Sequence, residues 1–176
     1  MATQIRLRDG TAVTLRPLVA ADRALIVDAF ERLSPRSRYL RFFTPVPRLP
    51  KRTLEALMDV DQVDHVALIA LHEGRCAGVV RAVRDRDDRS LAHLALTVVD
   101  AYQGRGLGRI LIAAIRDAAA ARGVSALVLD VHPENDVMQR LVRSLGVSLA
   151  FRDGALHGRL ALRRPHIAAA PLAEAA

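Results

Sequence analysis

The segment Gln103-Gly104-Arg105-Gly106-Leu107-Gly108 separates an apolar stretch, residues 94–99, from a helical pattern rich in Ala, Ile and Leu, residues 110–121. This order predicts a strand, a glycine-rich turn and a helix. Glycine lets the backbone approach a bulky anion without interference from a Cβ atom. The turn and the N-terminus of the following helix present free N–H groups and a favourable dipole to that anion. The segment therefore predicts a cradle for a phosphate or pyrophosphate group.

Three kinds of nucleotide site use such a turn. A dinucleotide-binding fold places it after the first strand, with an acidic residue ~20 positions further on. Here the turn lies in the middle of the chain, and Asp130, 22 residues after Gly108, ends a different predicted strand. A P-loop requires a lysine directly after its last glycine, and the single lysine of this chain is Lys51. An acyl-CoA cradle is the third kind and fits the pattern.

The composition bounds the class of protein. The chain has 176 residues, 51% of them hydrophobic, which is enough for one domain with a sizeable core. No apolar run reaches the ~18–20 residues that a membrane span requires, and residues 1–10 lack the apolar region of a signal peptide. One cysteine, Cys76, fits a reducing compartment. We therefore expect a cytoplasmic protein without a membrane partner, and we expect no metal.

The net charge of +7 comes from arginine, because only one of the 26 basic residues is lysine. A GC-rich coding bias and attraction to a polyanionic ligand both explain this excess. Basic residues alternate with acidic ones, as in residues 84–89, and aromatic residues make up only 3% of the chain. A nucleic-acid partner is therefore not expected.

Hydrophobic periodicity and turn signals predict an α/β fold with one mixed, mostly antiparallel sheet of about seven strands flanked by helices. A hairpin is expected around Asp9-Gly10 and another around Asp153-Gly154. Helices are expected over residues 22–33, 35–42, 51–60, 110–121 and 135–145, and strands over residues 65–71, 76–83, 91–98 and 124–131. Residues 1–165 are expected to form the single domain, and residues 166–176, rich in Ala, a flexible tail.

The turn resembles the signature of the GCN5-related N-acetyltransferase (GNAT) family, Gln/Arg-x-x-Gly-x-Gly/Ala, which Gln103, Gly106 and Gly108 fill. The resemblance extends from Ile5 to about Leu162. It implies a sheet with splayed central strands, a CoA pyrophosphate on the backbone N–H groups of residues 104–109, and a pantetheine arm paired with residues 96–98. The cofactor-binding residues that it implies are Leu96, Thr97, Val98, Gln103, Gly104, Arg105, Gly106, Leu107, Gly108, Arg109 and Asn135.

Asn135 has two interpretations. The resemblance implies that its side chain contacts the CoA arm. Its position after Pro133-Glu134 also suits a helix N-cap that does nothing else.

Residues 34–43, SPRSRYLRFF, resemble a segment of the bacterial protein-lysine acetyltransferases of the Pat type, which act on acyl-CoA synthetases and similar targets. Such proteins often carry a further regulatory domain, which we do not expect in these 176 residues. Arg38, Tyr39 and Arg41 are candidate acceptor-site residues, with a solvated helical face as the alternative for the arginines.

Acetyl transfer needs a neutral amine, and a lysine amine has a pKa of ~10.4 in water. A base must therefore take its proton, directly or through water. The resemblance implies a base on the strand before the turn, where the Pat type has glutamate and this chain has His93, ten residues before Gln103. His132, at the end of the neighbouring strand, is a weaker candidate. Either histidine can also be structural. The resemblance further implies that the N–H of Val98 polarises the thioester.

Together these features predict a bacterial, acetyl-CoA-dependent N-acetyltransferase that acetylates a protein lysine by direct transfer, with a histidine or water-mediated base. Two alternatives remain open. One is a small-amine or amino-acid N-acetyltransferase, and the other is a catalytically weak acyl-CoA-binding regulatory protein. Acceptor identity, acyl-chain preference and oligomeric state are left open.

Overall fold

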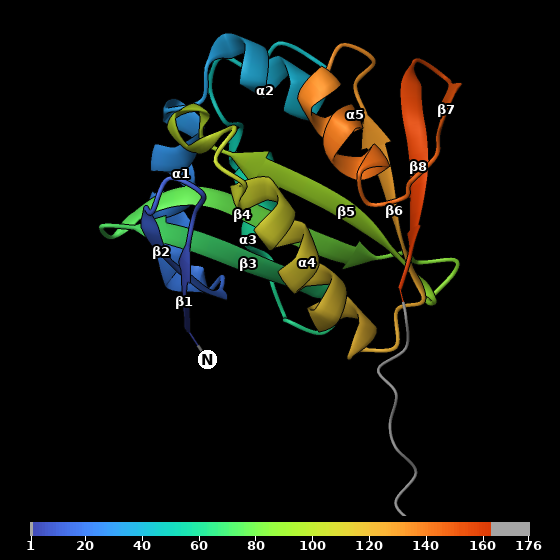
Figure 1. Cartoon of the computed structure of the whole chain (residues 1–176), viewed down its shortest axis with the longest axis horizontal. Coiled ribbons are helices and arrows are strands. Elements are labelled where there is room, and N and C mark those ends of the chain that lie inside the picture. The colour runs from blue at the N-terminus through green and yellow to red at the C-terminus, as the bar shows by residue number, and fades with distance from the viewer. Residues whose placement is uncertain (1, 163–176) are drawn as a thin grey trace, which may run out of the picture.

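A computed structural model describes residues 2–162, and within them eight strands form one sheet in the order β1-β2-β3-β4-β5-β6-β8-β7 (Figure 1). The strands are β1 Thr3–Arg6, β2 Ala12–Pro17, β3 His65–His72, β4 Arg75–Arg84, β5 Leu91–Val98, β6 Ala126–Val131, β7 Leu149–Arg152 and β8 Ala155–Ala161. Every neighbouring pair is antiparallel except β5 and β6, which are parallel. Two predictions lie outside the described residues: the domain end at residue 165 and the tail over residues 166–176.

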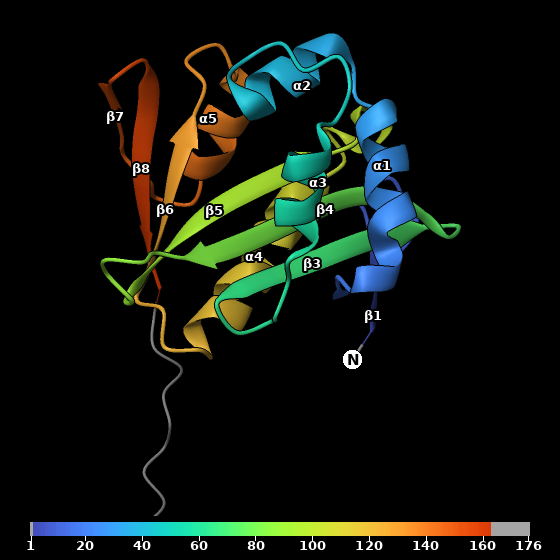
Figure 2. The same cartoon turned by 180° about the vertical axis from the view of Figure 1, so that it is seen from behind.

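Helices cover both faces of this sheet. They are α1 Arg23–Glu31, α2 Pro35–Phe42, α3 Lys51–Met58, α4 Leu107–Ala120 and α5 Asp136–Arg143, with short 3-10 turns at Ala20–Asp22 and Asp100–Tyr102. Figure 1 shows α4 and α5 on one face, and Figure 2 shows α1 and α3 on the other. None of the helices in residues 2–162 is long and apolar enough to cross a bilayer.

The expected mixed, mostly antiparallel α/β fold is confirmed, with eight strands where about seven were expected. The strand count rises because both terminal hairpins join the same sheet. The helix expected over residues 110–121 begins earlier, at Leu107, because Gly106 adopts a left-handed φ of 89° and ends the turn there. The last residues of the turn motif therefore belong to the first turn of α4.

Close packing of α4 on the sheet fixes the position of the turn. The helix buries Leu107, Leu111 and Ile115 on one face, at the i, i+4 and i+8 spacing of an amphipathic helix. Gly78 of β4 makes the contact possible, because a Cβ atom there would lie 3.0 Å from the carbonyl oxygen of Thr97 and 3.1 Å from Leu111 Cδ1. The start of α4 is thereby held beside the end of β5.

The two parallel strands separate after a short contact. β5 pairs with β6 only through Leu91, Ala92 and His93, opposite residues 126–128. Beyond His93 the strands diverge, as Figure 1 shows, while β5 continues to pair with β4 up to Val98. The expected splayed central strands are confirmed, and His93 lies where the V-shaped gap begins.

Candidate active site

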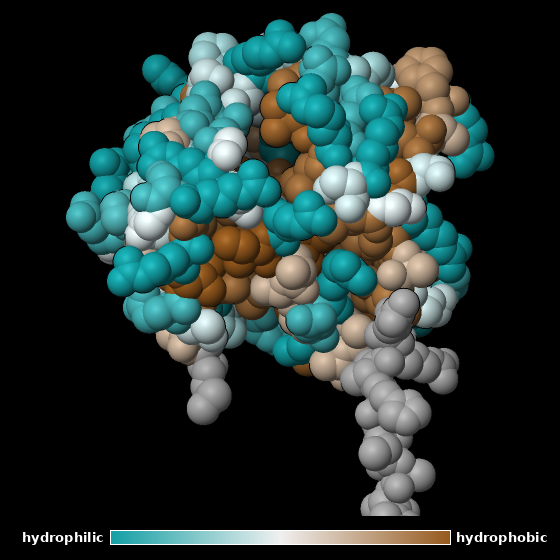
Figure 3. All heavy atoms as spheres, in the orientation of Figure 1, coloured by the Kyte–Doolittle hydropathy of each residue, from teal (hydrophilic) through white to brown (hydrophobic). Residues whose placement is uncertain are grey.

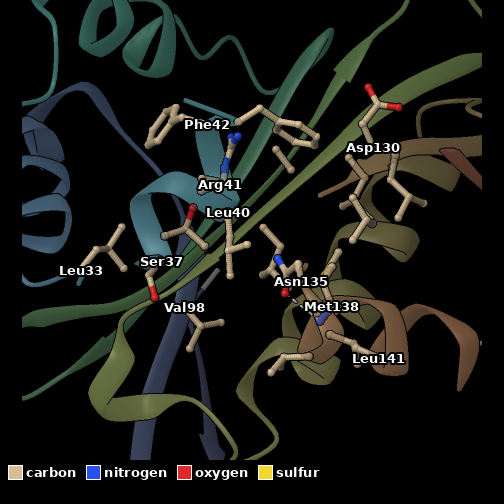
Figure 4. A pocket seen from close by; sticks show the side chains of 18 of the residues that line it. Leu33, Ser37, Leu40, Arg41, Phe42, Val98, Asp130, Asn135, Met138 and Leu141 are labelled. Atoms are coloured by element: carbon tan, nitrogen blue, oxygen red, sulfur yellow. Dashed lines mark hydrogen bonds between the residues drawn. The ribbon is translucent and has the colours of Figure 1, made fainter. Parts of the chain in front are cut away.

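A cavity of about 530 Å³ fills the gap between β5 and β6. Such a volume lies in the usual range of ligand-binding pockets. Its walls come from β5, β6, α2 and α5, and Figure 4 shows Arg41 and Phe42 of α2 facing Asn135 and Met138 of α5. The hollow between α2 and α5 in Figure 3 has hydrophobic side chains inside it and hydrophilic ones around it. The site is therefore a mainly apolar slot with polar groups near its ends.

The open edge of β5 supplies backbone hydrogen-bonding groups to this cavity. The N–H of Val99 donates to the carbonyl oxygen of Ala77 on β4, at 3.0 Å. Because backbone groups alternate sides along a strand, those of Leu96 and Val98 point away from β4 and into the gap. The carbonyl oxygen of Val98 accepts from Gln103 Nε2 at 3.1 Å, on that side. The N–H groups of Leu96 and Val98 are thus placed to pair with an extended ligand.

The glycine turn is held rigidly beside the cavity. Gly104 and Gly106 have φ angles of 73° and 89°, which glycine adopts without strain. The N-terminal hairpin braces the turn, because the N–H of Arg8 donates to the carbonyl oxygen of Arg105 at 3.1 Å. The Arg105 guanidinium also pairs with Asp9 at 2.8 Å.

The N–H groups at the start of α4 face no acceptor within the helix, as is general for a helix N-terminus. They belong to Leu107, Gly108 and Arg109, the last residues of the expected pyrophosphate cradle. The Arg109 side chain donates to Ser144 Oγ at 3.2 Å, so it ties α4 to the end of α5. What residues 107–109 can offer an anion is therefore their backbone.

Asn135 caps α5 and also borders the cavity. Its Oδ1 accepts from the N–H of Met138 at 3.1 Å, which caps α5. The side chain also lines the cavity (Figure 4). The cap uses only the amide oxygen, so the Nδ2 group is still able to donate to a ligand.

His93 lines the cavity and forms a pair with Asp85. Its Nε2 lies 2.8 Å from Asp85 Oδ2, and its side chain is 57% exposed. The N–H groups of Asp88 and Asp87 both donate to Asp85 Oδ1 at 2.9 Å. The hydrogen bond from Asp88, together with those from His93 and Asp87, lowers the pKa of Asp85 to about 2. The carboxylate is therefore ionised at neutral pH and holds one nitrogen of the imidazole.

The sequence alone did not single out Asp85. It lies in the polar run 84–89, which reads as a solvated loop. The sequence did predict two successive strands, β4 and β5, on either side of this loop. An antiparallel pairing of these strands places Asp85, directly after β4, close to His93 near the start of β5.

His132 lies elsewhere. It is 9% exposed, and its ring packs against Tyr39 and Phe43 at centroid distances of 4.7 and 5.3 Å. Its Nδ1 accepts from the N–H of Glu134 at 3.2 Å. Neither His132 nor Tyr39 is among the residues that line the cavity. The structure thus brings these two candidates together in a packing contact, and the third ring of that contact, Phe43, does line the cavity.

The arginines of α2 differ in what they contact. Arg38 donates to the carbonyl oxygens of Phe30, Pro47 and Glu31 at 3.2, 2.8 and 3.0 Å. These contacts use the Arg38 guanidinium to hold α2 to α1 and to the following loop, so an acceptor contact by Arg38 stays a prediction. Arg41 does line the cavity.

Sequence reasoning also missed Arg81, which is buried in the middle of β4 and only 6% exposed. A charged residue inside the otherwise apolar stretch 76–83 was the signal for it.

Comparison with known proteins agrees with this architecture. Residues 29–147 match the model of the acetyltransferase (GNAT) family, so the chain belongs to this family of acetyltransferases. An acetyltransferase of Pseudomonas aeruginosa is 32% identical over 144 residues, covering 80% of this chain and 77% of the relative. Acetyltransferase Pat of Mycolicibacterium smegmatis is 31% identical over 145 residues. That match covers 81% of this chain but only 43% of the length of Pat.

Solved structures show the same fold. The GNAT domain of PAT from S. lividans superposes with a TM-score of 0.87 at 30% identity, covering 92% of this chain and 97% of that one. A putative acetyltransferase from Salmonella typhimurium, solved with acetyl-CoA, has a TM-score of 0.67 at 22% identity, covering 92% of this chain and 98% of that one. At that identity it supports the fold alone.

Proposed function

We propose that this chain transfers the acetyl group of acetyl-CoA to the side-chain amine of a protein lysine, in one step and with His93 as the base. The observation that carries the proposal is the coincidence of three features in one cavity. They are the open edge of β5, the glycine turn beside it, and the His93–Asp85 pair where β5 and β6 separate. The likeness of residues 34–43 to the Pat-type segment supports a protein acceptor, such as an acyl-CoA synthetase. The proposed catalytic domain comprises residues 1–165.

The described residues fit acetyl-CoA as the donor. Leu96 and Val98 offer backbone groups for the extended arm, and Asn135 Nδ2 offers a further donor. The N–H groups of residues 104–109 and the start of α4 suit the pyrophosphate. The donor supplies a thioester whose C–S bond breaks as the C–N bond forms.

Residues of this chain then remove the proton from the amine and stabilise the negative charge on the thioester oxygen. In water at neutral pH only about one lysine amine in 2,500 is neutral, so a base is needed to take the proton from the amine. Asp85 accepts a hydrogen bond from Nε2 of His93, which leaves Nδ1 with the lone pair that takes the proton from the amine. We assign the N–H of Leu96 to the thioester oxygen, where negative charge develops. Leu96 lies three residues from His93 on the open edge of β5, whereas Val98 lies about 16 Å from it along the strand. The thiolate leaves and takes a proton from solvent.

The donor half is tested by thermal unfolding with and without acetyl-CoA. We expect acetyl-CoA to raise the Tm of the wild type. Gly106→Ala places a side chain at a φ of 89° and is expected to lower stability by about 1 kcal/mol and to weaken this stabilisation. Gly123→Ala is a matched control, because Gly123 has a φ of 81° at the far end of α4. It should lose similar stability and keep the full response to acetyl-CoA; equal loss of the response in both would contradict the cradle.

The acceptor half is tested by the release of CoA with peptide, protein and small-amine acceptors. His93→Ala is expected to lower kcat/KM by about 100-fold or more, since general bases contribute ~10²–10⁴-fold, with little change in acetyl-CoA binding. Unchanged kcat/KM from pH 6 to pH 9 would show that His93 is not the base. Acetyl-CoA binding without turnover on any amine would favour a regulatory acyl-CoA-binding protein instead.

A further inference from the structure

Two arginines that form no salt bridge within residues 2–162 lie at or beside the main cavity. We propose that Arg41 and Arg81 bind a carboxylate on the acceptor, so that the enzyme selects amines that carry a nearby acidic group. This inference rests on the proposed acetyl transfer and adds the chemical class of the acceptor.

Arg81 is aimed inward by fixed contacts. One of its terminal nitrogens, Nη1, donates to the carbonyl oxygen of Leu57 at 2.8 Å and lies 3.1 Å from His65 Nε2. His65 Nδ1 in turn lies 2.6 Å from the carbonyl oxygen of Asp59, so Nδ1 carries the proton and Nε2 accepts from Arg81. These contacts use Nη1 and leave the rest of the guanidinium able to donate to a ligand.

Arg41 approaches from α2 and lines the same space. It and Arg81 both border a smaller cavity of about 50 Å³ that also touches Leu57, Ala95 and Thr97. Across residues 2–162, no carboxylate forms a salt bridge with either arginine.

Two unpaired cations in a poorly solvated space repel each other and lack solvation. Burial, together with the charge of Arg41, lowers the pKa of Arg81 to about 10. Burial also lowers the pKa of Arg41. An anion placed between them would relieve both costs. A carboxylate suits a guanidinium particularly well, because it can accept two parallel hydrogen bonds.

The smaller cavity adjoins the main one. Arg41, Phe42, Ala95 and Thr97 border both the small cavity and the main one. Ala95 lies opposite Arg81 in the strand register, and it borders both spaces with a small side chain. His93 lies two residues from Ala95 on the same face of β5, a rise of about 7 Å. One acceptor can therefore place its carboxylate at the arginines and its amine near His93.

Two kinds of acceptor carry this chemistry. One is a small amino acid, whose own carboxylate would bind the arginines. The other is a protein lysine that has an Asp or Glu side chain beside it in the sequence or the fold. The shared element is a carboxylate within one or two side-chain lengths of the amine.

The test compares acceptors that differ only in the carboxylate. The probes are 4-aminobutyrate against 4-aminobutyramide, and a lysine peptide with a neighbouring Glu against the same peptide with Gln. We expect the carboxylate member of at least one pair to have a 10- to 100-fold higher kcat/KM, the size that charge-assisted hydrogen bonds give. The small-molecule pair and the peptide pair show which source the site uses.

Variants of the two arginines test whether the preference for a carboxylate acceptor comes from this site. Arg41→Gln is expected to remove most of the preference by raising KM for the carboxylate acceptor, and Arg41→Lys to restore part of it. Arg52→Gln is the matched control, because it removes the same charge from an exposed position on α3 outside both cavities. Arg52→Gln should keep the full preference. Arg81→Gln is a second variant with the same expected direction.

Outcomes for the inference and for the proposed function are separable. Equal kcat/KM within every acceptor pair, or a preference that survives in Arg41→Gln, would overturn the carboxylate site while leaving acetyl transfer intact. Failure to acetylate any amine would overturn the proposed function. In that case glutarate still probes the arginines: it should raise the Tm of the wild type and not that of Arg41→Gln, and no difference between them would overturn the site.

Discussion

Asp85 restricts His93 to one arrangement of its protons. The carboxylate is 2.8 Å from Nε2 and is itself held by two backbone N–H groups of its loop. An ionised acceptor at Nε2 favours the tautomer with the proton on that nitrogen. Asp85 is therefore a positioning residue for the proposed base, since it acts through His93 and does not line the cavity.

Asp85→Asn tests this role. An amide oriented by the same loop can still contact Nε2, but it no longer favours a proton there or a positive charge on the ring. We expect kcat to fall by about 10- to 100-fold, with KM for acetyl-CoA unchanged and the rise of kcat with pH displaced to different pH values. Steady-state rates from pH 6 to pH 9 measure this. A fall in Tm with an unaltered pH profile would indicate that Asp85 only stabilises the loop.

Local conformations could be predicted from the sequence, whereas the contacts of individual side chains could not. The turn glycines and Asn135 were located from local spacing, and their conformations are local properties. Arg38 and Arg41 stand three positions apart in one helix, yet Arg38 binds backbone carbonyls and Arg41 lines the cavity. Which side each faces depends on α1 and on the following loop, and nothing in residues 34–43 reveals those partners.

At the level of elements, α5 is positioned by a cap that also belongs to the site. The Asn135 side chain caps the helix through Oδ1 and borders the cavity. Two variants separate these functions. Serine can replace the cap, because its hydroxyl also accepts from the helix N–H groups, but it is too short to extend far into the cavity.

We expect Asn135→Ala to lower the free energy of unfolding by about 1 kcal/mol and Asn135→Ser to lower it by only a few tenths. Both should weaken acetyl-CoA binding if the amide contacts the arm. Urea unfolding and calorimetric titration with acetyl-CoA measure the two effects. Wild-type affinity in Asn135→Ser would mean that Asn135 is a cap and nothing more.

The order and type of elements were accessible from periodicity and turn chemistry, and the splayed strands from the family resemblance. The register that places Arg81 opposite Ala95, and the loop that returns Asp85 to His93, were not accessible. These contacts join segments through the tertiary structure, where packing of the whole sheet decides the outcome. The inference about a carboxylate acceptor depends on such a contact and had no counterpart in the sequence.

At the level of the whole molecule, ionised aspartates stabilise the fold. Hydrogen bonds from Arg16 lower the pKa of the buried Asp22 carboxylate, and the loop amides lower that of Asp85 to about 2. An unfolded aspartate titrates near ~3.9. Each such group therefore contributes stability that is present above about pH 4 and is lost as the pH falls through the folded pKa.

We expect the urea midpoint to change little from pH 7 to pH 5 on account of these aspartates and to fall steeply between about pH 4 and pH 2. Asp22→Asn removes one contribution, so its midpoint should be lower at pH 7 and should approach that of the wild type in acid. Parallel curves for the two proteins across this pH range would contradict the assignment to Asp22.

The separation of β5 and β6 gives α2 a mechanical role. Near its N-terminus the N–H of Ser34 donates to Asp100, just past the end of β5, at 3.1 Å. Toward its C-terminus Tyr39 packs on His132, directly after β6. The two strands and the helix thus form a closed triangle, with His93 at one corner and His132 at another. Because α2 contacts the ends of both diverging strands, the packing of Tyr39 on His132 helps to fix the width of the slot in which His93 is proposed to work.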